Sequence, residues 1–240
     1  MESAFQSINY IFDIDGTLTP SRLPINKDFK SWFLRWCKNK SIYFVTGSNK
    51  EKTIEQIGMD MWRIPCKMYQ SCGNEVYCGG VLCSHHDFSI TDELRMFLRD
   101  LLKKSPWYGI NEYSINIEKR VGLVNFSTIG RNCSQQQRKE YASKERERKD
   151  YVKAIMQRFP DLEASIGGEI SIDIYKRGHN KAQILNDIRG YSIFFGDGCE
   201  GGNDEPLAKR VDKAFHVKDW KETWSILKSM ENKDERGYYK

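Results

Sequence analysis

Short, mostly apolar runs that end abruptly in small polar residues recur along the chain. The runs are Ile8 to Phe12, Ser41 to Val45 and Ser192 to Phe195, followed in turn by Asp13-Ile14-Asp15-Gly16, Thr46-Gly47-Ser48 and Gly196-Asp197-Gly198. A buried parallel strand reads as a continuous apolar run, and its carboxyl end delivers polar groups to one edge of the sheet. The pattern therefore predicts a parallel sheet with oxygen-bearing side chains gathered at one edge.

Helix-like segments alternate with these strands. Residues 27–38, 50–58, 181–188 and 219–230 have the apolar periodicity of helices. Alternation of strands and helices is what βαβ units require. Both ends of the chain are therefore expected to contribute to one doubly wound α/β core.

The middle of the chain has a different order of elements. We expect an amphipathic helix at 92–104, a long charged helix at 135–158, and strands at 112–118, 122–127 and 170–175. Such an order is typical of an antiparallel sheet backed by two helices. The predicted division is a catalytic core made of residues 1–83 and 184–240, with an α+β module inserted at 84–183.

Composition narrows the class of protein. The 240 residues suffice for two modest domains, and the net charge of +5 suits a protein that handles anionic small molecules about as well as one that binds nucleic acid. No apolar run approaches the roughly 20 residues that cross a bilayer, and the N-terminus lacks a secretory pattern. Seven cysteines without a CxxC pair favour a reducing compartment. We therefore expect a cytoplasmic protein with no membrane association.

Four of the cysteines crowd one stretch that ends in two histidines, which raises the alternative of a zinc site. The residues are Cys66, Cys72, Cys78, Cys83, His85 and His86. Structural zinc usually requires ligand pairs two to four residues apart, and the gaps here are wider. Thiols on short strands are the favoured interpretation.

The segment Asp13-Ile14-Asp15-Gly16 carries the chemistry of phosphoryl transfer. Asp13 can attack phosphorus and form an acyl phosphate, while Asp15 can pass a proton to or from the oxygen that leaves or arrives. Carboxylates and phosphate repel one another, so such a site needs a cation, and Mg²⁺ is the hard ion that their oxygens select. Asp197, at the end of a neighbouring predicted strand, is the expected further ligand.

Other groups can stabilise the transferring phosphoryl group. Thr46 and Ser48 can donate hydrogen bonds to it, and Lys181 can neutralise its charge. An isolated pair of aspartates after a strand is often only a turn or a helix cap. The ordered set of groups along this chain is what favours a catalytic site.

Taken together, these motifs resemble the four motifs of the haloacid dehalogenase (HAD) superfamily. The set is Asp13/Asp15/Gly16/Thr17, Thr46 in VTGS, Lys181, and Gly196-Asp197 with Asn203-Asp204. The resemblance implies a HAD-like Rossmannoid core with a parallel sheet, and an inserted α+β cap domain with an antiparallel sheet. It also implies that Mg²⁺ is bound by Asp13, the backbone carbonyl of Asp15, and Asp197, with Asn203 and Asp204 supporting the shell.

Longer segments look like the eukaryotic-type phosphomannomutase family within that superfamily. They are Phe12-DIDGTLTPSR-Leu23, Gly122-LVNFSTIGRNCSQQQR-Lys139, Ser165-IGGEISIDIYKRGHNK-Ala182 and Phe194-FGDGCEGGND-Glu205. In that family, arginines hold the sugar phosphate, and a serine and an aspartate of a cap strand contact sugar hydroxyls. The corresponding residues here are Arg22, Arg120, Arg131, Arg138, Ser171 and Asp173.

The resemblance therefore implies a Mg²⁺-dependent isomerase that interconverts mannose 6-phosphate and mannose 1-phosphate, supplying the precursor of GDP-mannose. A sugar bisphosphate would be the activator and intermediate. The resemblance also implies a homodimer through the caps, for which the apolar face of 92–104 is a candidate, although a core contact within one chain explains that face equally well. The segment 144–150 is expected to be a solvated helix face with paired charges.

Two alternatives remain at this stage. Thr46-Gly47-Ser48 stands where phosphomannomutases have Gly-Gly-Ser, which is closer to the capped sugar phosphatases of the superfamily, so hydrolysis of a hexose phosphate is the second hypothesis. The third is a catalytically silent module that binds nucleic acid through the basic helix at 138–158. The joint presence of Asp13, Asp15, Lys181 and Asp197 argues against the third, since a scaffold needs none of them.

Overall fold

The chain forms two compact units. The computed structural model describes residues 8–111, 114–144 and 146–235. Unit 1 contains the chain up to Ser84, Lys181–Glu200 and the chain from Asp204, while unit 2 contains His85–Asn180 and Gly201–Asn203. Residues 181–183, which the sequence analysis placed in the insert, belong to unit 1 because Ala182 is buried in its core.

Unit 1 is built on a seven-stranded sheet in the order β11-β10-β1-β2-β3-β4-β5. The strands are β1 (Asn9–Phe12), β2 (Ser41–Val45), β3 (Lys67–Gln70), β4 (Glu75–Cys78), β5 (Val81–His85), β10 (Ser192–Gly196) and β11 (Lys213–His216). The strands from β11 to β3 pair in parallel, and β4 pairs antiparallel to β3. The central strand β1 lies between β2 and β10, and these three strands pair in parallel, as the apolar runs predicted.

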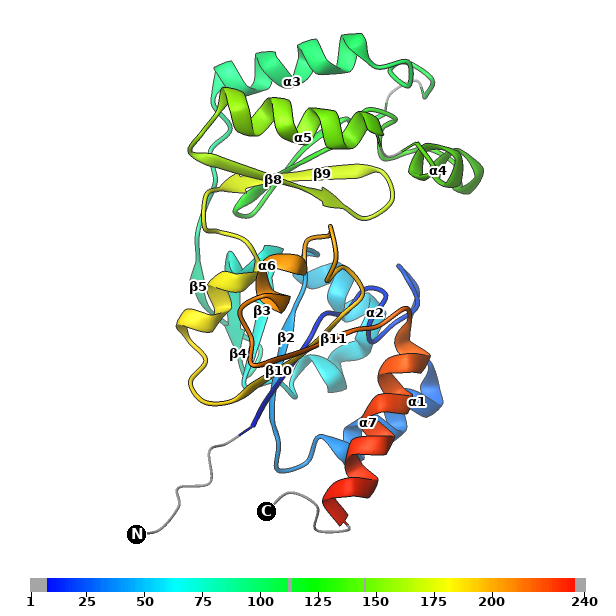
Figure 1. Cartoon of the computed structure of the whole chain (residues 1–240), viewed down its shortest axis with the longest axis vertical. Helices are drawn as coiled ribbons and strands as arrows, with labels where there is room; N and C mark the ends of the chain where they lie inside the picture. The colour runs from blue at the N-terminus through cyan, green and yellow to red at the C-terminus, as the bar shows by residue number, and fades with distance from the viewer. Residues whose placement is uncertain (1–7, 112–113, 145, 236–240) are drawn as a thin grey trace. The chain divides into compact units, whose positions relative to one another are not determined.

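Two apolar clusters cover the faces of this sheet. The helices are α1 (Lys27–Trp36), α2 (Lys50–Trp62), α6 (Glu205–Ala208), α7 (Trp220–Glu235) and the 3-10 helices η1 (Ser71–Gly73) and η2 (Lys181–Asn186). On one face, Phe12 and Phe44 of the sheet pack in one core with residues of α1, α2 and α7. On the other, Ile11 and Phe194 pack with η2 and α6. Figure 1 shows α1 and α7 side by side, and the Phe29 and Trp224 rings stack with their centroids 5.4 Å apart.

Unit 2 is a four-stranded antiparallel sheet in the order β6-β7-β9-β8. The strands are β6 (Ile117–Arg120), β7 (Leu123–Phe126), β8 (Leu162–Gly167) and β9 (Ser171–Lys176), and the helices are α3 (Asp92–Lys104), α4 (Gln135–Ala142) and α5 (Arg146–Arg158). Helices α3 and α5 lie over one face of the sheet (Figure 1). Leu94, Leu98, Leu101 and Leu102 of α3 are buried there against the strands. A contact within one chain therefore accounts for the apolar face of 92–104.

Two predictions in the middle of the chain are wrong. The helix expected at 135–158 is two helices, because α4 ends at Ala142 with Ser143 as its C-cap and α5 begins at Arg146. Arg148, expected on a solvated face, is 2% exposed. Its guanidinium lies over the Tyr141 ring and donates from Nη1 to the Gly168 carbonyl at 2.7 Å. Part of the strand expected at 112–118 lies outside the described residues.

The helix expected at 181–188 is instead the 3-10 helix η2. Helices α2 and α7 extend beyond their predicted ends, and α2 continues past Gly58, whose φ of 79° marks a kink. No helix in the described ranges is both long enough and apolar enough to cross a membrane.

Candidate active site

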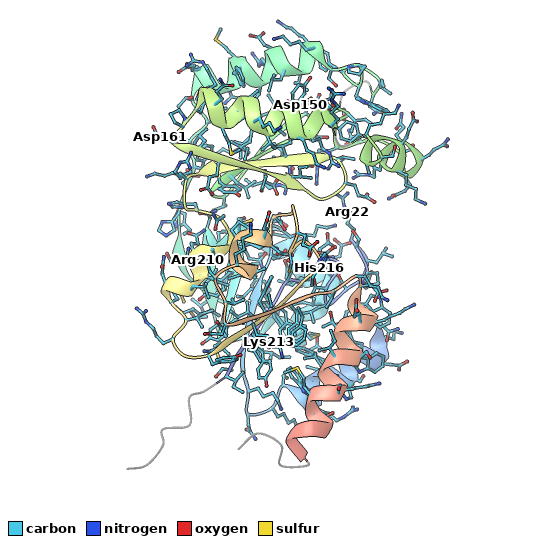
Figure 2. All side chains as sticks on the ribbon, viewed as in Figure 1. Arg22, Asp150, Asp161, Arg210, Lys213 and His216 are labelled. Atoms are coloured by element: carbon cyan, nitrogen blue, oxygen red, sulfur yellow. The ribbon has the colours of Figure 1, made fainter. Side chains whose placement is uncertain are left out.

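The carboxyl ends of β1, β2 and β10 bring Asp13, Thr46 and Asp197 to one edge of the sheet. The register pairs Phe12 with Phe44 on one side and with Phe195 on the other. The Asp13 backbone N–H donates to the Phe195 carbonyl at 2.9 Å, which fixes the backbone at the end of β1 against β10. Strand β11 runs from Lys213 to His216. In Figure 2, His216 and Arg22 lie toward one end of unit 1, and Lys213 lies further from that end.

Gly16 makes room for the Asp197 carboxylate. Its φ is 92°, a left-handed conformation that glycine adopts at little cost. A Cβ at this position would lie 2.1 Å from Asp197 Oδ2. The glycine after the second aspartate is therefore required both by the turn and by the neighbouring carboxylate.

Lys181 is a buried cation shared by two buried carboxylates. Its Nζ lies 2.6 Å from Asp13 Oδ1 and 2.6 Å from Asp204 Oδ1. The side chains of all three residues are at most 5% exposed. Asp204 is held in turn by the Gly198 backbone N–H, which donates to its Oδ2 at 2.9 Å. The structure therefore brings Lys181 to Asp13, although the two residues are 168 positions apart in the sequence.

Crowding of negative charge dominates the electrostatics of this cluster. Burial, then the charges of Asp204 and Asp197, raise the pKa of Asp13 well above its ordinary value against the opposing effect of Lys181. Burial disfavours the charged form of Lys181, but the charges of Asp13 and Asp204 outweigh it and raise the lysine pKa. One ammonium is thus shared among more carboxylates than it can neutralise.

The donor set fits a divalent cation. Each of Asp13, Asp197 and Asp204 offers a carboxylate oxygen, and these oxygens lie within 4.8 Å of one another, the only such group in the described part of the chain. Carboxylate oxygens are the ligands that Mg²⁺ selects, and a cation among them would relieve the repulsion that raises the pKa of Asp13. The expected contributions of the Asp15 carbonyl and of Asn203 stay predictions. No zinc cluster of cysteines and histidines occurs among the same described residues.

The effect of the crowded negative charge can be measured at Asp197 through protein stability, without an activity assay. Although Asp197 as a whole is exposed, desolvation of its carboxylate and the charge of Asp204 raise its pKa to about 6. The folded chain thus holds this proton more tightly than the unfolded chain, whose aspartates titrate near 3.9. The proton on Asp197 therefore contributes to the free energy of unfolding. This contribution is fully present below about pH 4 and is lost as the pH rises through about 6.

We therefore expect the Tm of the metal-free protein to fall as the pH rises through about 6. After allowance for solvent screening the change is on the order of 1 kcal/mol. Thermal unfolding measured across this range should show a weaker pH dependence for Asp197→Asn, and Mg²⁺ should raise Tm more in the parent than in the variant. An identical pH dependence in both proteins would contradict the assignment.

Asp15 is held by groups that sequence reasoning did not single out. Its Oδ1 accepts hydrogen bonds from the Arg22 backbone N–H and, at 2.9 Å, from Gln56 Nε2. Gln56 is 2% exposed, lies on α2 and also donates to Thr19 Oγ1 at 3.2 Å. The sequence carried a signal for it, because Thr53 and Gln56 are polar residues three positions apart on the buried face of α2.

We expect Gln56→Met to lower kcat by about tenfold with little change in KM, because the Asp15 carboxylate would lose one of its two anchors. Steady-state assays that determine kcat and KM separately test this expectation. Gln136→Met, which alters an exposed glutamine on α4, serves as the control. Equal losses in the two variants would show that Gln56 does not orient Asp15.

Thr46 is joined to the neighbouring loop by its backbone. The residue is 2% exposed, its carbonyl accepts from the Cys72 N–H at 2.8 Å, and its Oγ1 accepts from the Ser48 N–H at 3.1 Å. Ser71 and Cys72 have φ values of 50° and 61° although neither is glycine. Such backbone outliers occur at functional sites. The loop after β3 is therefore part of the architecture that positions Thr46.

In unit 2, the face of the sheet away from α3 and α5 is polar. The register places Asn125 opposite Asp173, and Asn125 Nδ2 donates to Asp173 Oδ1 at 2.6 Å. Ser171 lies two residues before Asp173 on β9 and so shares its face. Asn125 is 2% exposed and was not identified from the sequence. It holds the carboxylate that we expected to contact a sugar.

The three arginines expected in the cap gather beside this face. Arg131 Nη1 donates to Ser171 Oγ at 3.2 Å, and Arg138 Nη2 donates to the Arg131 carbonyl at 2.9 Å. Arg120 Nη2 and Arg131 Nε lie 2.6 Å and 3.6 Å from Glu118 Oε2. The structure thus places Arg120, Arg131 and Ser171 in one connected polar group with Asn125 and Asp173, with Arg138 bonded to the backbone of Arg131. Arg22 belongs to unit 1.

Comparison with solved structures identifies the fold. A haloacid dehalogenase-like hydrolase from Bacteroides thetaiotaomicron superposes with a TM-score of 0.59 at 13% identity, covering 94% of this chain and 99% of that one. At this identity the likeness shows the fold alone. It confirms the predicted HAD-like core with an inserted α+β module.

Comparison of sequences identifies the family. The sequence model described as eukaryotic phosphomannomutase matches residues 109–232. The phosphomannomutase of Saccharomyces cerevisiae is 31% identical over 81% of this chain and 82% of its own length, and that of Encephalitozoon cuniculi is 33% identical over 85% of each. The resemblance stated from the motifs is thereby confirmed. The chain belongs to the eukaryotic phosphomannomutase family.

Proposed function

We propose that the chain interconverts mannose 6-phosphate and mannose 1-phosphate through an aspartyl phosphate on Asp13 and a sugar bisphosphate intermediate. The observation that carries the proposal is the Asp13 carboxylate, buried at the end of β1 and held 2.6 Å from Lys181, in a chain whose relatives are named phosphomannomutases. A buried carboxylate in contact with a cation is the expected form of an oriented nucleophile.

Asp13 and Asp15 divide the chemistry between them. An oxygen of Asp13 attacks the phosphorus of a sugar bisphosphate, a P–O bond to the sugar breaks, and Asp15 gives a proton to the departing sugar oxygen. The phosphoryl group then passes from Asp13 to the free hydroxyl of a mannose monophosphate, which loses its proton to Asp15 and becomes mannose 1,6-bisphosphate. Transfer of the other phosphoryl group of this bisphosphate to Asp13, with Asp15 again giving a proton to the departing oxygen, leaves the isomeric monophosphate. Gln56 and the Arg22 backbone orient Asp15 for both proton transfers.

Mg²⁺ bound by Asp13, Asp197 and Asp204 would supply charge neutralisation for the transferring phosphoryl group. Lys181 neutralises further charge at Asp13, because its pKa is raised and it stays protonated. Thr46 follows β2 at the edge where Asp13 lies, and its hydroxyl is assigned to the phosphoryl oxygens.

The residues of unit 2 are assigned to the part of the substrate that does not react. Arg120, Arg131 and Arg138 bind the second phosphate, since guanidinium forks match phosphate oxygens in pairs. Ser171 and Asp173 bind sugar hydroxyls. Arg22 is assigned to the sugar phosphate from unit 1. We further propose that the protein acts in the cytoplasm and supplies the precursor of GDP-mannose. We also propose that it forms a homodimer through unit 2.

One assay decides between a mutase and a phosphatase. The protein is mixed with Mg²⁺, mannose 1-phosphate and glucose 1,6-bisphosphate as activator, and mannose 6-phosphate and inorganic phosphate are measured together. We expect mannose 6-phosphate as the main product and a strict requirement for the bisphosphate. Release of inorganic phosphate without mannose 6-phosphate would reject the mutase and favour hydrolysis.

A further inference from the structure

Glu118 forms ion pairs with two of the arginines that are assigned to bind phosphate. Its Oε2 accepts from Arg120 Nε at 3.0 Å and from Arg120 Nη2 at 2.6 Å. Arg131 Nε lies 3.6 Å from the same oxygen. The Glu118 side chain is 36% exposed and the two arginines are 19% and 26% exposed. A single carboxylate oxygen of unit 2 therefore accepts both hydrogen bonds from the edge of Arg120 and forms an ion pair with Arg131.

The sheet geometry explains why these groups meet. Glu118 and Arg120 are two residues apart on β6, so their side chains share a face. Glu118 pairs in register with Asn125, and Asn125 pairs with Asp173, so all four residues lie on the polar face of the sheet. Arg131 reaches the same face through its hydrogen bond to Ser171. The contact is therefore built into strand register.

The donors used by Glu118 are those that an anionic ligand would need. Nε and Nη2 form one edge of the Arg120 fork, which is the edge that grips two oxygens of a phosphate or carboxylate. On Arg131, Nη1 is already engaged by Ser171 and Asn125, so Nε is the donor that faces Glu118. A phosphate bound at this edge of Arg120 must displace the Glu118 carboxylate.

We propose that Glu118 is a specificity-determining residue: its carboxylate competes with anionic ligands for these arginines and keeps weakly held, singly charged anions out of the site. The proposal rests on the proposed function, because it concerns the arginines assigned there to the substrate. Exchanging the Glu118 carboxylate for a singly charged ligand replaces one unit of negative charge with another, so little attraction is gained. A phosphate dianion brings twice the charge, so its attraction to the arginines exceeds the cost of displacing Glu118, which is the same for every ligand.

The test is equilibrium binding of two matched ligands, mannose 6-phosphate and mannose 6-sulfate, to the full chain by calorimetry without a bisphosphate activator. We expect Glu118→Gln to bind both esters about tenfold more tightly, because the cost of displacing the carboxylate is removed from each, so that the sulfate ester binds measurably. Glu118→Asp, which keeps the charge, should show little of this gain. Steady-state assays of Glu118→Gln should show a lower KM and an unchanged or lower kcat.

The control is Glu93→Gln, which removes one negative charge and breaks the Arg158–Glu93 ion pair on the helix-covered side of the same unit. It should change neither affinity. Weaker binding of both ligands to a folded Glu118→Gln protein would overturn the proposal, since Glu118 would then merely orient the arginines. Unchanged affinities would overturn it as well, as would a parent protein that binds neither ligand.

The binding measurement does not depend on turnover. If the parent fails the mutase assay but Glu118→Gln still binds both esters more tightly, the proposed function fails and the inference about Glu118 stands. If the mutase assay succeeds and the affinities are unaltered, only the inference fails.

Discussion

Asp13→Asn is expected to lower the rate of mannose phosphate interconversion by at least about 10⁴-fold, because an amide cannot form an acyl phosphate. The side chain keeps its shape and can still accept a hydrogen bond from Lys181. Loss of turnover would therefore reflect lost nucleophilicity. Incubation with a sugar bisphosphate followed by acid quench and peptide mass spectrometry should locate one phosphoryl group on Asp13 in the parent and none in the variant.

Stability should change in the opposite direction to activity in this variant. Burial and the charges of Asp204 and Asp197 raise the pKa of Asp13, so its charged form costs free energy in the folded protein. A neutral amide removes that cost, and the metal-free Asp13→Asn protein should have a Tm at least equal to that of the parent. The matched control is Asp187→Asn, which alters a half-exposed aspartate of the same unit paired with Lys67 at 3.0 Å. Turnover by Asp13→Asn at the level of this control would refute the covalent mechanism.

Lys181→Met is expected to be the most destabilising of the single changes considered, at about 3–5 kcal/mol. The ammonium is 1% exposed and lies 2.6 Å from both Asp13 and Asp204. Methionine of similar length would leave two buried carboxylates facing each other without a shared cation. Urea unfolding of the metal-free protein measures the free energy of unfolding directly, and turnover should fall by at least about 10²-fold.

The control for this change is Lys67→Met in the same unit. Its ion pair with Asp187 has side chains that are 34% and 43% exposed, so the expected cost is below about 1 kcal/mol. Mg²⁺ should restore part of the stability lost in Lys181→Met, because it would compensate the same carboxylates. Similar losses in the two lysine variants would show that burial of Lys181 does not carry the effect.

Local patterns were sufficient to predict the sheet edge that carries the reactive groups. The apolar residues before Asp13 and Asp197 indicated buried strands, and parallel strands necessarily meet at one edge, where the structure brings these carboxylates close to each other. Prediction was weaker where a residue depends on a distant partner. Asn125 lies in a strand that the alternation predicted, but Asp173, which it binds, is 48 residues away.

Arg148 shows why the pattern of charged residues gave a wrong prediction of solvent exposure. Charged residues on both sides indicated a solvated face, yet its burial depends on the Tyr141 ring and on the Gly168 carbonyl, 20 residues later in the chain. Gln56 was missed for a related reason, because its partner Asp15 is 41 residues away. Periodicity records which face of an element is buried, and it contains no information on what a buried polar group will meet.

The position of β1 has a consequence for biosynthesis. One edge of this strand pairs with β2 soon after both emerge, but the other edge needs β10, and the Asn9 side chain donates to the carbonyl of Tyr191, 182 residues later. At about 5–20 residues per second, a ribosome requires roughly 10–40 seconds to supply that partner. Residues His85–Asn180 have all been translated by then and can acquire their own core. A nascent polypeptide that still lacks β10 therefore carries Asp13 without Asp197 and Asp204, the two carboxylates that complete the cluster around it.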